Sequence, residues 1–253
     1  MKKDTVRQVL ILLSVMATIF VNGLASSLPL NGKTTGEISD SFDVFFVPAG
    51  YVFSIWGLIY VGLIAYAVYQ LLPAQADNPA LRSIGPIFIL SSLANIAWIF
   101  LWHYEIFSLT VVAMLILLAC LIVIYLRLDI GRAQVSSGMR WFVHLPFSIY
   151  LGWITVATIA NVTTLLAYWD WSGWGISPEA WAVIMLTIAT AVGGLVSFTR
   201  SDIAYAAVLI WAFAGIGVKQ SDTSVVAAAA WVATVITAIL LIIGVYRRRR
   251  AVG

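Results

Sequence analysis

Charged residues are scarce in this sequence. Aspartate, glutamate, lysine and arginine make up 10% of its 253 residues, whereas 62% of the residues are hydrophobic. A soluble domain usually carries about a quarter charged residues, so this chain has too few polar side chains to cover a surface in water. The composition therefore indicates a protein whose surface faces lipid.

The alternating polarity of a membrane β-barrel is also missing. A barrel would show alternating segments of about ten residues, but the apolar runs here are continuous and about twice that long. Only helices and closed barrels satisfy every backbone polar group inside a bilayer, so we predict an all-α integral membrane protein with about eight transmembrane helices. The predicted spans are residues 6–28, 48–72, 84–102, 106–126, 141–168, 178–198, 203–218 and 224–246.

The usual patterns of catalytic and metal sites are absent from the sequence. The two histidines, His103 and His144, are predicted to lie on opposite sides of the membrane, so they are not expected to share a metal. His103 with Glu105 is interpreted as a solvated turn. Cys120, the single cysteine, has no partner for an internal disulfide. No phosphate-binding glycine loop or nucleophile motif is present, and no acidic residue is firmly placed in a span. An enzyme and an ion-coupled pump are therefore both disfavoured.

The basic residues are distributed unequally between the two ends of the predicted spans. With the N-terminus inside, twelve lie in inner segments and two in outer ones. The inner set is Lys2, Lys3, Arg7, Arg82, Arg127, Arg132, Arg140, Arg200 and Arg247 to Arg250, and the outer set is Lys33 and Lys219. By the positive-inside rule we predict a multi-pass cell-membrane protein with both termini in the cytoplasm.

The arginine cluster at 247–250 would also suit a nucleic acid or anionic lipids. Fixing the orientation of the chain is the simpler interpretation, and no nucleic-acid partner is expected. The first span has an alternative too, because Leu24-Ala25-Ser26-Ser27 after an apolar stretch resembles a signal-peptide cleavage site. Asn22 inside that stretch favours a retained helix of the bundle.

Four polar groups fall at one predicted depth. Asn22, Asn95, Asn161 and Trp56 each lie six to eight residues from the outer end of a span, or roughly 10 Å below the outer surface at 1.5 Å per residue. Polar side chains in a membrane usually face the bundle interior. Two interpretations stay open: interhelical hydrogen bonds that hold the bundle together, or a ligand site.

The tryptophans divide into two groups. One group at the predicted membrane interfaces is typical of an aromatic belt; it consists of Trp102, Trp141, Trp169, Trp171, Trp174 and Trp181. The other group lies inside the spans and consists of Trp56, Trp98, Trp153, Trp211 and Trp231. Three sets of residues on these spans each share one helix face and place aromatic rings beside a polar group. The three sets are Trp56 with Tyr60, Asn95 with Trp98 and Trp102, and Tyr150 with Trp153, Ala157 and Asn161. This pattern suits a flat, largely apolar ligand, although an aromatic structural core remains an alternative.

Three motifs occur in order along the first five predicted spans. They are Pro-Ala-Gly-Tyr-Val-Phe-Ser-Ile-Trp-Gly-Leu-Ile-Tyr at 48–60, Asn-Ile-Ala-Trp at 95–98, and Ile-Tyr-Leu-Gly-Trp at 149–153 with Ala157 and Asn161 beyond it. Together they resemble the signatures of the second, third and fifth helices of the TspO/MBR family, the tryptophan-rich sensory or translocator proteins. The usual proline before Ile55 is missing, and Ile149 stands where the fifth-helix proline would be.

The resemblance covers roughly residues 6–170 and implies a five-helix bundle with an internal pocket for tetrapyrroles, sterols or synthetic aromatic ligands. We predict a TspO/MBR-like bundle over residues 1–170 and three additional transmembrane helices with a basic tail over residues 171–253. Position by position, the resemblance implies that the pocket is lined or supported by Trp56, Asn95, Trp98, Trp153, Ala157 and Asn161. The depth and helix-face arguments add Asn22, Tyr60 and Tyr150.

The predicted function is a membrane-embedded receptor, sensor or carrier for a flat amphipathic molecule, with the outer loop 29–47 as a lid. A porphyrin or haem would be a ligand of this protein and not a resident cofactor. One alternative is a small-molecule transporter in which the last three helices complete a translocation path, and another is a structural or assembly protein without a ligand. The sequence leaves open whether the chain forms a homo-oligomer, and the resemblance leaves open sensing, transport or tetrapyrrole degradation.

Overall fold

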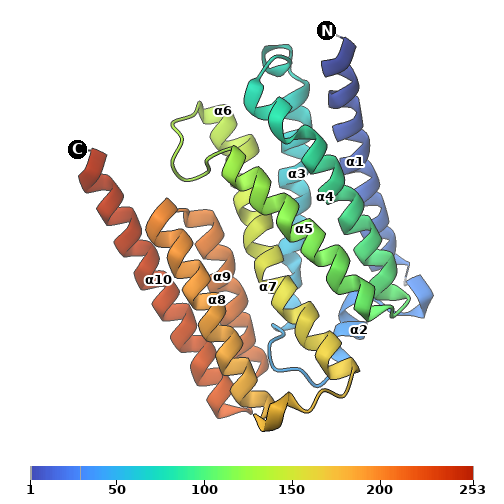
Figure 1. Ribbon diagram of the computed structural model, residues 1–253, viewed down its shortest axis with the longest axis vertical. Coiled ribbons are helices and arrows are strands. Elements are labelled where there is room, and N and C mark those ends of the chain that lie inside the picture. The colour runs from blue at the N-terminus through green and yellow to red at the C-terminus, as the bar shows by residue number, and fades with distance from the viewer. Residues whose placement is uncertain (1, 29, 253) are drawn as a thin grey trace. The chain divides into compact units, whose positions relative to one another are not determined.

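The computed structural model describes residues 2–28 and 30–252, and the regular structure of those residues is helical (Figure 1). Residues 1, 29 and 253, which begin or end predicted segments, lie outside the described residues. The helices are α1 (Lys2–Ser27), α2 (Thr35–Asp40), α3 (Ile55–Leu71), α4 (Pro79–His103), α5 (Phe107–Arg127), α6 (Ser137–Met139), α7 (Leu145–Tyr168), α8 (Pro178–Arg200), α9 (Ile203–Lys219) and α10 (Ser224–Val252). A π-helical turn, Arg140–His144, joins α6 to α7.

Each of the eight predicted spans corresponds to a helix. Among the described residues, seven helical segments are long and apolar enough to cross a membrane, and α9 is a shorter apolar helix of 17 residues. At 1.5 Å per residue α9 is about 26 Å long, slightly less than the bilayer's hydrocarbon core of about 30 Å. The prediction of an all-α integral membrane protein is confirmed.

The helix ends follow from local capping residues. Asn78 caps α4 by accepting a hydrogen bond from the backbone N–H of Ala80, and Ser177 caps α8 in the same way through Ala180. Both helices begin with proline, whose fixed φ suits the first helical position. The Asp202 carboxylate caps α9 by accepting from the N–H groups of Ala204 and Tyr205.

The shortest connection between two spans is the turn after α4. Glu105 adopts a left-handed backbone conformation with φ 58°, and the N–H of Ile106 donates to the carbonyl of Leu101 over 2.9 Å. This arrangement gives carbonyl groups in the last turns of α4 a hydrogen-bond donor and reverses the chain within three residues. The predicted division of this long apolar stretch into two helices is therefore confirmed.

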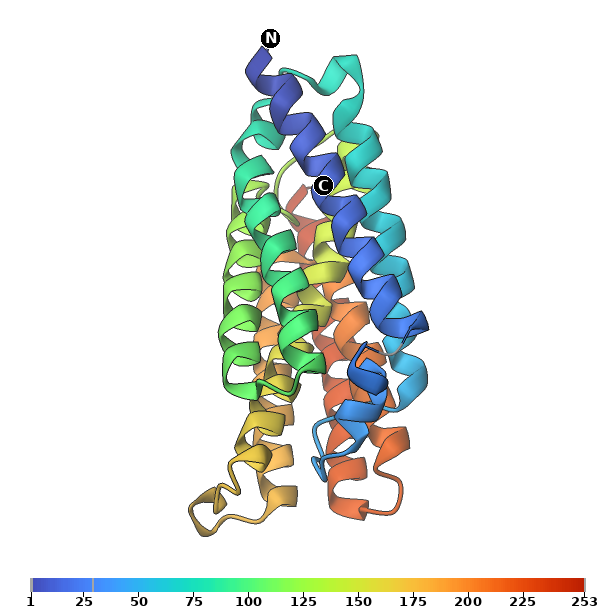
Figure 2. The same ribbon diagram turned by 90° about the vertical axis from the view of Figure 1, so that its right-hand side faces the viewer.

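The first compact unit comprises Met1–Ser41 and Trp56–Leu151. Within it α4 packs against both α1 and α5, and Figure 2 shows these helices from the side. Tyr66, Phe88 and Phe147 form a buried aromatic core, with ring centroids of 5.0 Å from Tyr66 to each phenylalanine. Helix α1 packs against α4 in this unit, and the retention of the first span stays a prediction.

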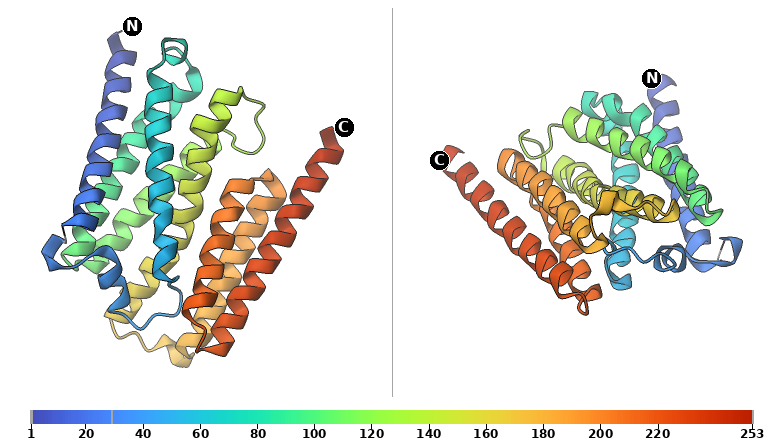
Figure 3. Two further views of the ribbon diagram at one scale, coloured as in Figure 1. Left: turned by 180° about the vertical axis from the view of Figure 1, so that it is seen from behind. Right: turned by 60° about the horizontal axis from the view of Figure 1, so that its bottom comes forward.

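The second compact unit comprises Phe42–Ile55 and Gly152–Gly253. Its helices α8, α9 and α10 pack against one another and run side by side in Figures 1 and 3. Glycine allows the close approach of these helices, because a Cβ added at Gly193 would lie 2.6 Å from the side chain of Leu209.

The boundary between the two units does not coincide with residue 170, the limit of the motif resemblance. It falls inside α7, whose residues up to Leu151 belong to the first unit and from Gly152 onward to the second. The segment before α3 is also assigned to the second unit, although it precedes most of the first unit in sequence. The division into residues 1–170 and 171–253 stays a prediction.

Candidate functional site

A chain of hydrogen bonds joins three of the predicted site residues in the first unit. The side-chain amide of Asn22 donates to Oδ1 of Asn95 over 2.8 Å, and Nδ2 of Asn95 donates to the hydroxyl of Tyr150 over 3.1 Å. All three residues are at most 4% exposed. Asn22 also donates to the carbonyl of Thr18. Helices α1, α4 and α7 thus meet through polar groups, as the matched depths of Asn22 and Asn95 predict.

Aromatic rings lie beside this hydrogen-bonded chain. Trp56 stacks on Tyr60 with a centroid distance of 5.7 Å, and it meets the ring of Tyr150 edge to face at 6.1 Å. Trp56 and Tyr60 are half-buried. On α4, the buried ring of Trp98 stacks on Trp102 at 5.2 Å. The first unit therefore brings the polar layer and one aromatic pair together.

The remaining predicted site residues lie on the part of α7 that belongs to the second unit. Trp153 is 2% exposed and packs edge to face on Phe53 at 5.6 Å. Asn161 is buried and Ala157 is half-buried. The nine predicted residues are thus divided between the two units, and their role in ligand contact stays a prediction.

In the second unit, residues 42–55, which lead from the outer loop to α3, are bonded to α9. The N–H of Ala49 donates to the carbonyl of Gly215 over 3.1 Å, and the indole of Trp211 donates to the carbonyl of Val52 over 3.4 Å. A Cβ at Gly215 would lie 2.2 Å from Val52, so only glycine permits this approach. Further out, the amide of Gln220 donates to the carbonyl of Phe45.

His103 is buried, which corrects the prediction of a solvated turn. Its ring nitrogens lie 3.2 Å from the carbonyl of Leu30 and 3.0 Å from the hydroxyl of Thr35, and its own carbonyl accepts from Asn31. The interpretation failed because the first part of the outer loop folds over the end of α4 and removes His103 from water. The histidine therefore anchors this part of the loop and is not left free as a ligand.

A capping box fixes the short helix α2 of the outer loop. The Thr34 side chain accepts from the N–H of Glu37, and the Glu37 carboxylate accepts from the N–H of Thr34. The hydrogen bond from the Thr34 backbone is the larger cause that lowers the pKa of the Glu37 carboxyl below its usual range, and a hydrogen bond with the Thr34 side chain lowers it further. The indole of Trp102 donates to the carbonyl of Thr35, so α2 is also bonded to α4.

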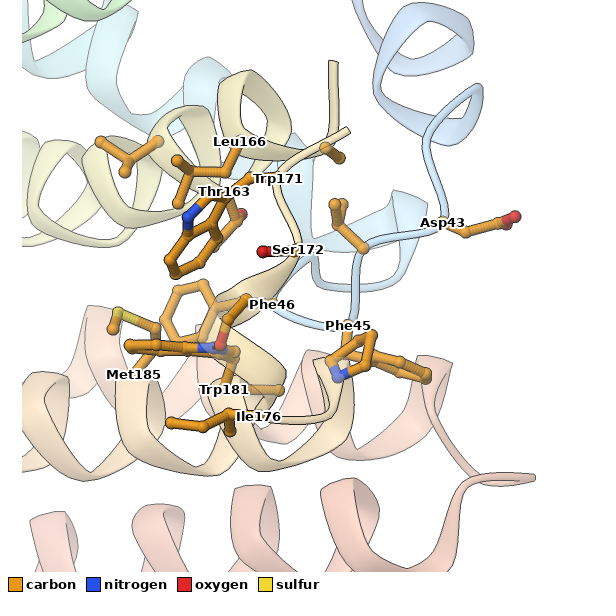
Figure 4. A pocket seen from close by; sticks show the side chains of 16 residues that line it. Asp43, Phe45, Phe46, Thr163, Leu166, Trp171, Ser172, Ile176, Trp181 and Met185 are labelled. Carbon is orange, nitrogen blue, oxygen red and sulfur yellow. Dashed lines mark hydrogen bonds between the residues drawn. The ribbon is translucent and has the colours of Figure 1, made fainter. Parts of the chain in front are cut away.

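A cavity of about 280 Å³ lies in the second unit, where residues 43–46 meet the C-terminal part of α7 and the N-terminal part of α8 (Figure 4). Its walls are mainly apolar. The lining residues are Asp43, Val44, Phe45, Phe46, Val162, Thr163, Leu166, Ala167, Trp171, Ser172, Gly173, Ile176, Pro178, Trp181, Ala182 and Met185. None of the nine predicted residues is among them, although Val162 and Thr163 directly follow Asn161.

Two indole rings form much of the cavity wall. The centroids of Trp171 and Trp181 are 5.2 Å apart, with their planes at 51°. The indole N–H of Trp181 donates to the carbonyl of Gly173 over 2.9 Å, which fixes the ring. Gly173 has φ +65°, and a Cβ there would lie 3.2 Å from Nε1 of Trp181. The turn between α7 and α8 therefore needs glycine at this position.

The cavity changes the interpretation of the interfacial tryptophans. Trp171 and Trp181 line it, and Trp102 is 4% exposed inside the first unit, so these three rings are not simple belt residues. Trp141 and Trp174 are 61% and 79% exposed, as a belt predicts. The sequence offered one signal for the cavity: glycines on both sides of Trp174 imply a tight turn that folds neighbouring tryptophans together.

The polar groups of the cavity are few. The Thr163 hydroxyl donates to the carbonyl of Ala160, and it keeps its capacity to accept a hydrogen bond. Ser172 lies in the wall, while Asp43 lies at the rim with its carboxylate turned away from Trp181 in Figure 4. In the described part of the chain, no group of three histidine, cysteine or acidic residues has the geometry of a metal site. The arrangement suits an aromatic molecule with a small polar substituent.

A family model described as TSPO-like protein matches residues 8–244 of this chain. The match extends past residue 170 and includes α8, α9 and most of α10, which the three motifs do not reach. The searches of curated proteins and of solved structures find no match to the chain.

Proposed function

The chain belongs to the TSPO-like protein family, and from this premise we propose that it is a membrane receptor or carrier for a flat, largely apolar ligand. The observation that carries the proposal is the tryptophan-walled cavity of the second unit. Flat aromatic surfaces with a few polar groups at their edges favour ligands of the same character. The loop residues Phe45 and Phe46 line one side of the cavity, which supports a role for them in covering a bound ligand.

The size of the cavity restricts the ligand. An apolar cavity of roughly 150 Å³ holds one benzene ring, so a cavity of about 280 Å³ holds a flat ligand of about two or three fused rings. A tetrapyrrole is larger than this. It would extend through the open side of the cavity or require the loop to move away from α9.

The proposal is tested by filling the cavity from α8. Met185 lines it, whereas Ile188, one turn later on the same helix, is 48% exposed and lies outside it. Purified wild-type protein, Met185→Trp and Ile188→Trp are titrated with the three-ring probe 9-anthracenemethanol and with protoporphyrin IX. Binding is followed by quenching of tryptophan fluorescence, and folding is checked by circular dichroism.

Wild-type protein is expected to bind at least the three-ring probe saturably. Met185→Trp should weaken that binding at least tenfold, which corresponds to about 1.4 kcal/mol, because the added indole occupies the ligand's space. Ile188→Trp should bind as wild type does. Folded wild-type protein that binds neither probe would leave the structural or assembly alternative as the better account. Saturable accumulation of the probe in vesicles would identify a carrier, and binding without accumulation a receptor.

A further inference from the structure

A second hollow lies between α8 and α10, on an apolar face of the second unit. It is an open groove of about 660 Å³, called here the α8–α10 groove. Its lining residues are Val183, Leu186, Thr187, Thr190, Ala191, Gly194, Leu195, Phe198, Ala229, Val232, Ala233, Ile236 and Leu240. This lining contains no charged side chain and shares no residue with the tryptophan-walled cavity.

Small residues on both helices produce the groove. Ala191 and Gly194 on α8 and Ala229 and Ala233 on α10 all line it, and their short side chains leave the helix surfaces hollowed. The helices are held close beside the groove, because a Cβ at Gly194 would lie 2.6 Å from the Leu240 side chain. The groove is therefore part of the packed helix pair.

The length of the groove matches a lipid chain. Its residues on α8 run from Val183 to Phe198, a distance of about 22 Å at 1.5 Å per residue. One leaflet contributes about half of a hydrocarbon core that is about 30 Å thick. The groove is thus long enough to hold an entire acyl chain along its length.

A cationic group lies at one end of the groove. The guanidinium carbon of Arg247 is 4.0 Å from the centroid of the Phe198 ring, and Phe198 is the last lining residue of α8. Arg247 begins a run of four arginines. A cation above an apolar groove complements a lipid whose phosphate is negatively charged and whose chain is apolar.

We propose that the α8–α10 groove binds one acyl chain of an anionic phospholipid, with the lipid phosphate at Arg247. This inference goes beyond the proposed function, because it concerns a different surface and a different class of ligand. It gives Arg247, the first of the terminal arginines, a role in lipid selection in addition to orientation of the chain.

Native mass spectrometry of purified protein tests the inference. The protein is supplied with equal amounts of phosphatidylglycerol and phosphatidylcholine, which have similar chains but differ in net charge. Wild-type protein should retain at least fivefold more phosphatidylglycerol. Arg247→Gln should remove this preference and still retain some of both lipids. Arg250→Gln is the matched control, because Arg250 lies over Tyr246 at 4.5 Å and not at the groove.

A second pair of variants tests the chain-binding part of the groove. Ala191→Phe fills the groove and should reduce retention of both lipids, whereas Val192→Phe, at the neighbouring 40% exposed position outside the groove, should not. Equal retention of the two lipids by wild-type protein would overturn the inference. An equal loss of the preference for phosphatidylglycerol in Arg247→Gln and Arg250→Gln would also overturn the inference. A dimer that only Ala191→Phe disrupts would make the groove a protein interface instead.

Discussion

Asn95 uses both functions of its side-chain amide at the same time. Its oxygen accepts from Asn22 of α1 and its nitrogen donates to Tyr150 of α7, so one residue of α4 connects three helices of the first unit. Such bonds in membranes contribute modestly on average, at about 0.6 kcal/mol each. Losing one partner is more costly, because the buried groups left behind lose the hydrogen bonds they had.

Substitution of Asn95 tests this connection. Asn95→Leu should lower the stability by about 1–3 kcal/mol, because Asn22 and Tyr150 both lose a partner. Asn95→Asp should cost about 2.5–3.5 kcal/mol if the carboxylate stays ionised within the span. Thermal unfolding in detergent measures both, with Leu93→Ala at a 57% exposed site of the same helix as control. Wild-type stability of Asn95→Leu would show that the bonds do not hold the bundle together.

The same residues show how far the sequence could predict the site. Depth along each span was enough to bring Asn22 and Asn95 together, because a helix rises a fixed distance per residue. Depth did not reveal that Trp171 and Trp181 share a cavity wall. The two rings come together across a turn in which Gly173 is left-handed. The cavity is completed by residues 43–46, which lie far from both tryptophans in the sequence.

At the scale of the elements, α9 is the shortest of the apolar helical segments predicted to cross the membrane. Its 17 residues cover about 26 Å, so it crosses a bilayer only with slight thinning of the lipid or with help from polar residues at its ends. Lys219 lies in its last turn and can extend toward the lipid headgroups. The same helix binds the segment of residues 42–55 in the second unit through Gly215 and Trp211.

The predicted side of the membrane for the segments after α9 depends on whether α9 crosses the bilayer. We predict that reporter fusions after Arg132 and Arg250 report the cytoplasm, and that fusions after Asp40 and Asp222 report the outside. The physical reason is the twelve-to-two distribution of basic residues. If α9 did not cross, the Asp222 fusion would report the cytoplasm and the Arg250 fusion the outside, which would contradict the eight-span arrangement.

At the scale of the whole molecule, helix number and type were predictable from the sequence because apolar run length sets transmembrane spans directly. The grouping of helices into packed units was not predictable in this way. Motif resemblance ends near residue 170, whereas the family match continues to residue 244 and the compact units divide within α7. Packing between helices depends on small residues such as Gly193 and Gly215, whose contacts are visible only in three dimensions.

The central claim is that the ligand of this TSPO-like protein occupies the cavity walled by Trp171 and Trp181. The most direct measurement compares the affinity of 9-anthracenemethanol for Trp171→Ala and Trp56→Ala, followed by the fluorescence of the probe. Trp171→Ala should weaken binding by about 2–4 kcal/mol, as loss of a buried aromatic anchor does, while Trp56→Ala should bind as wild type. The opposite result, with affinity lost in Trp56→Ala and kept in Trp171→Ala, would contradict the claim and favour the pocket that the sequence motifs predict.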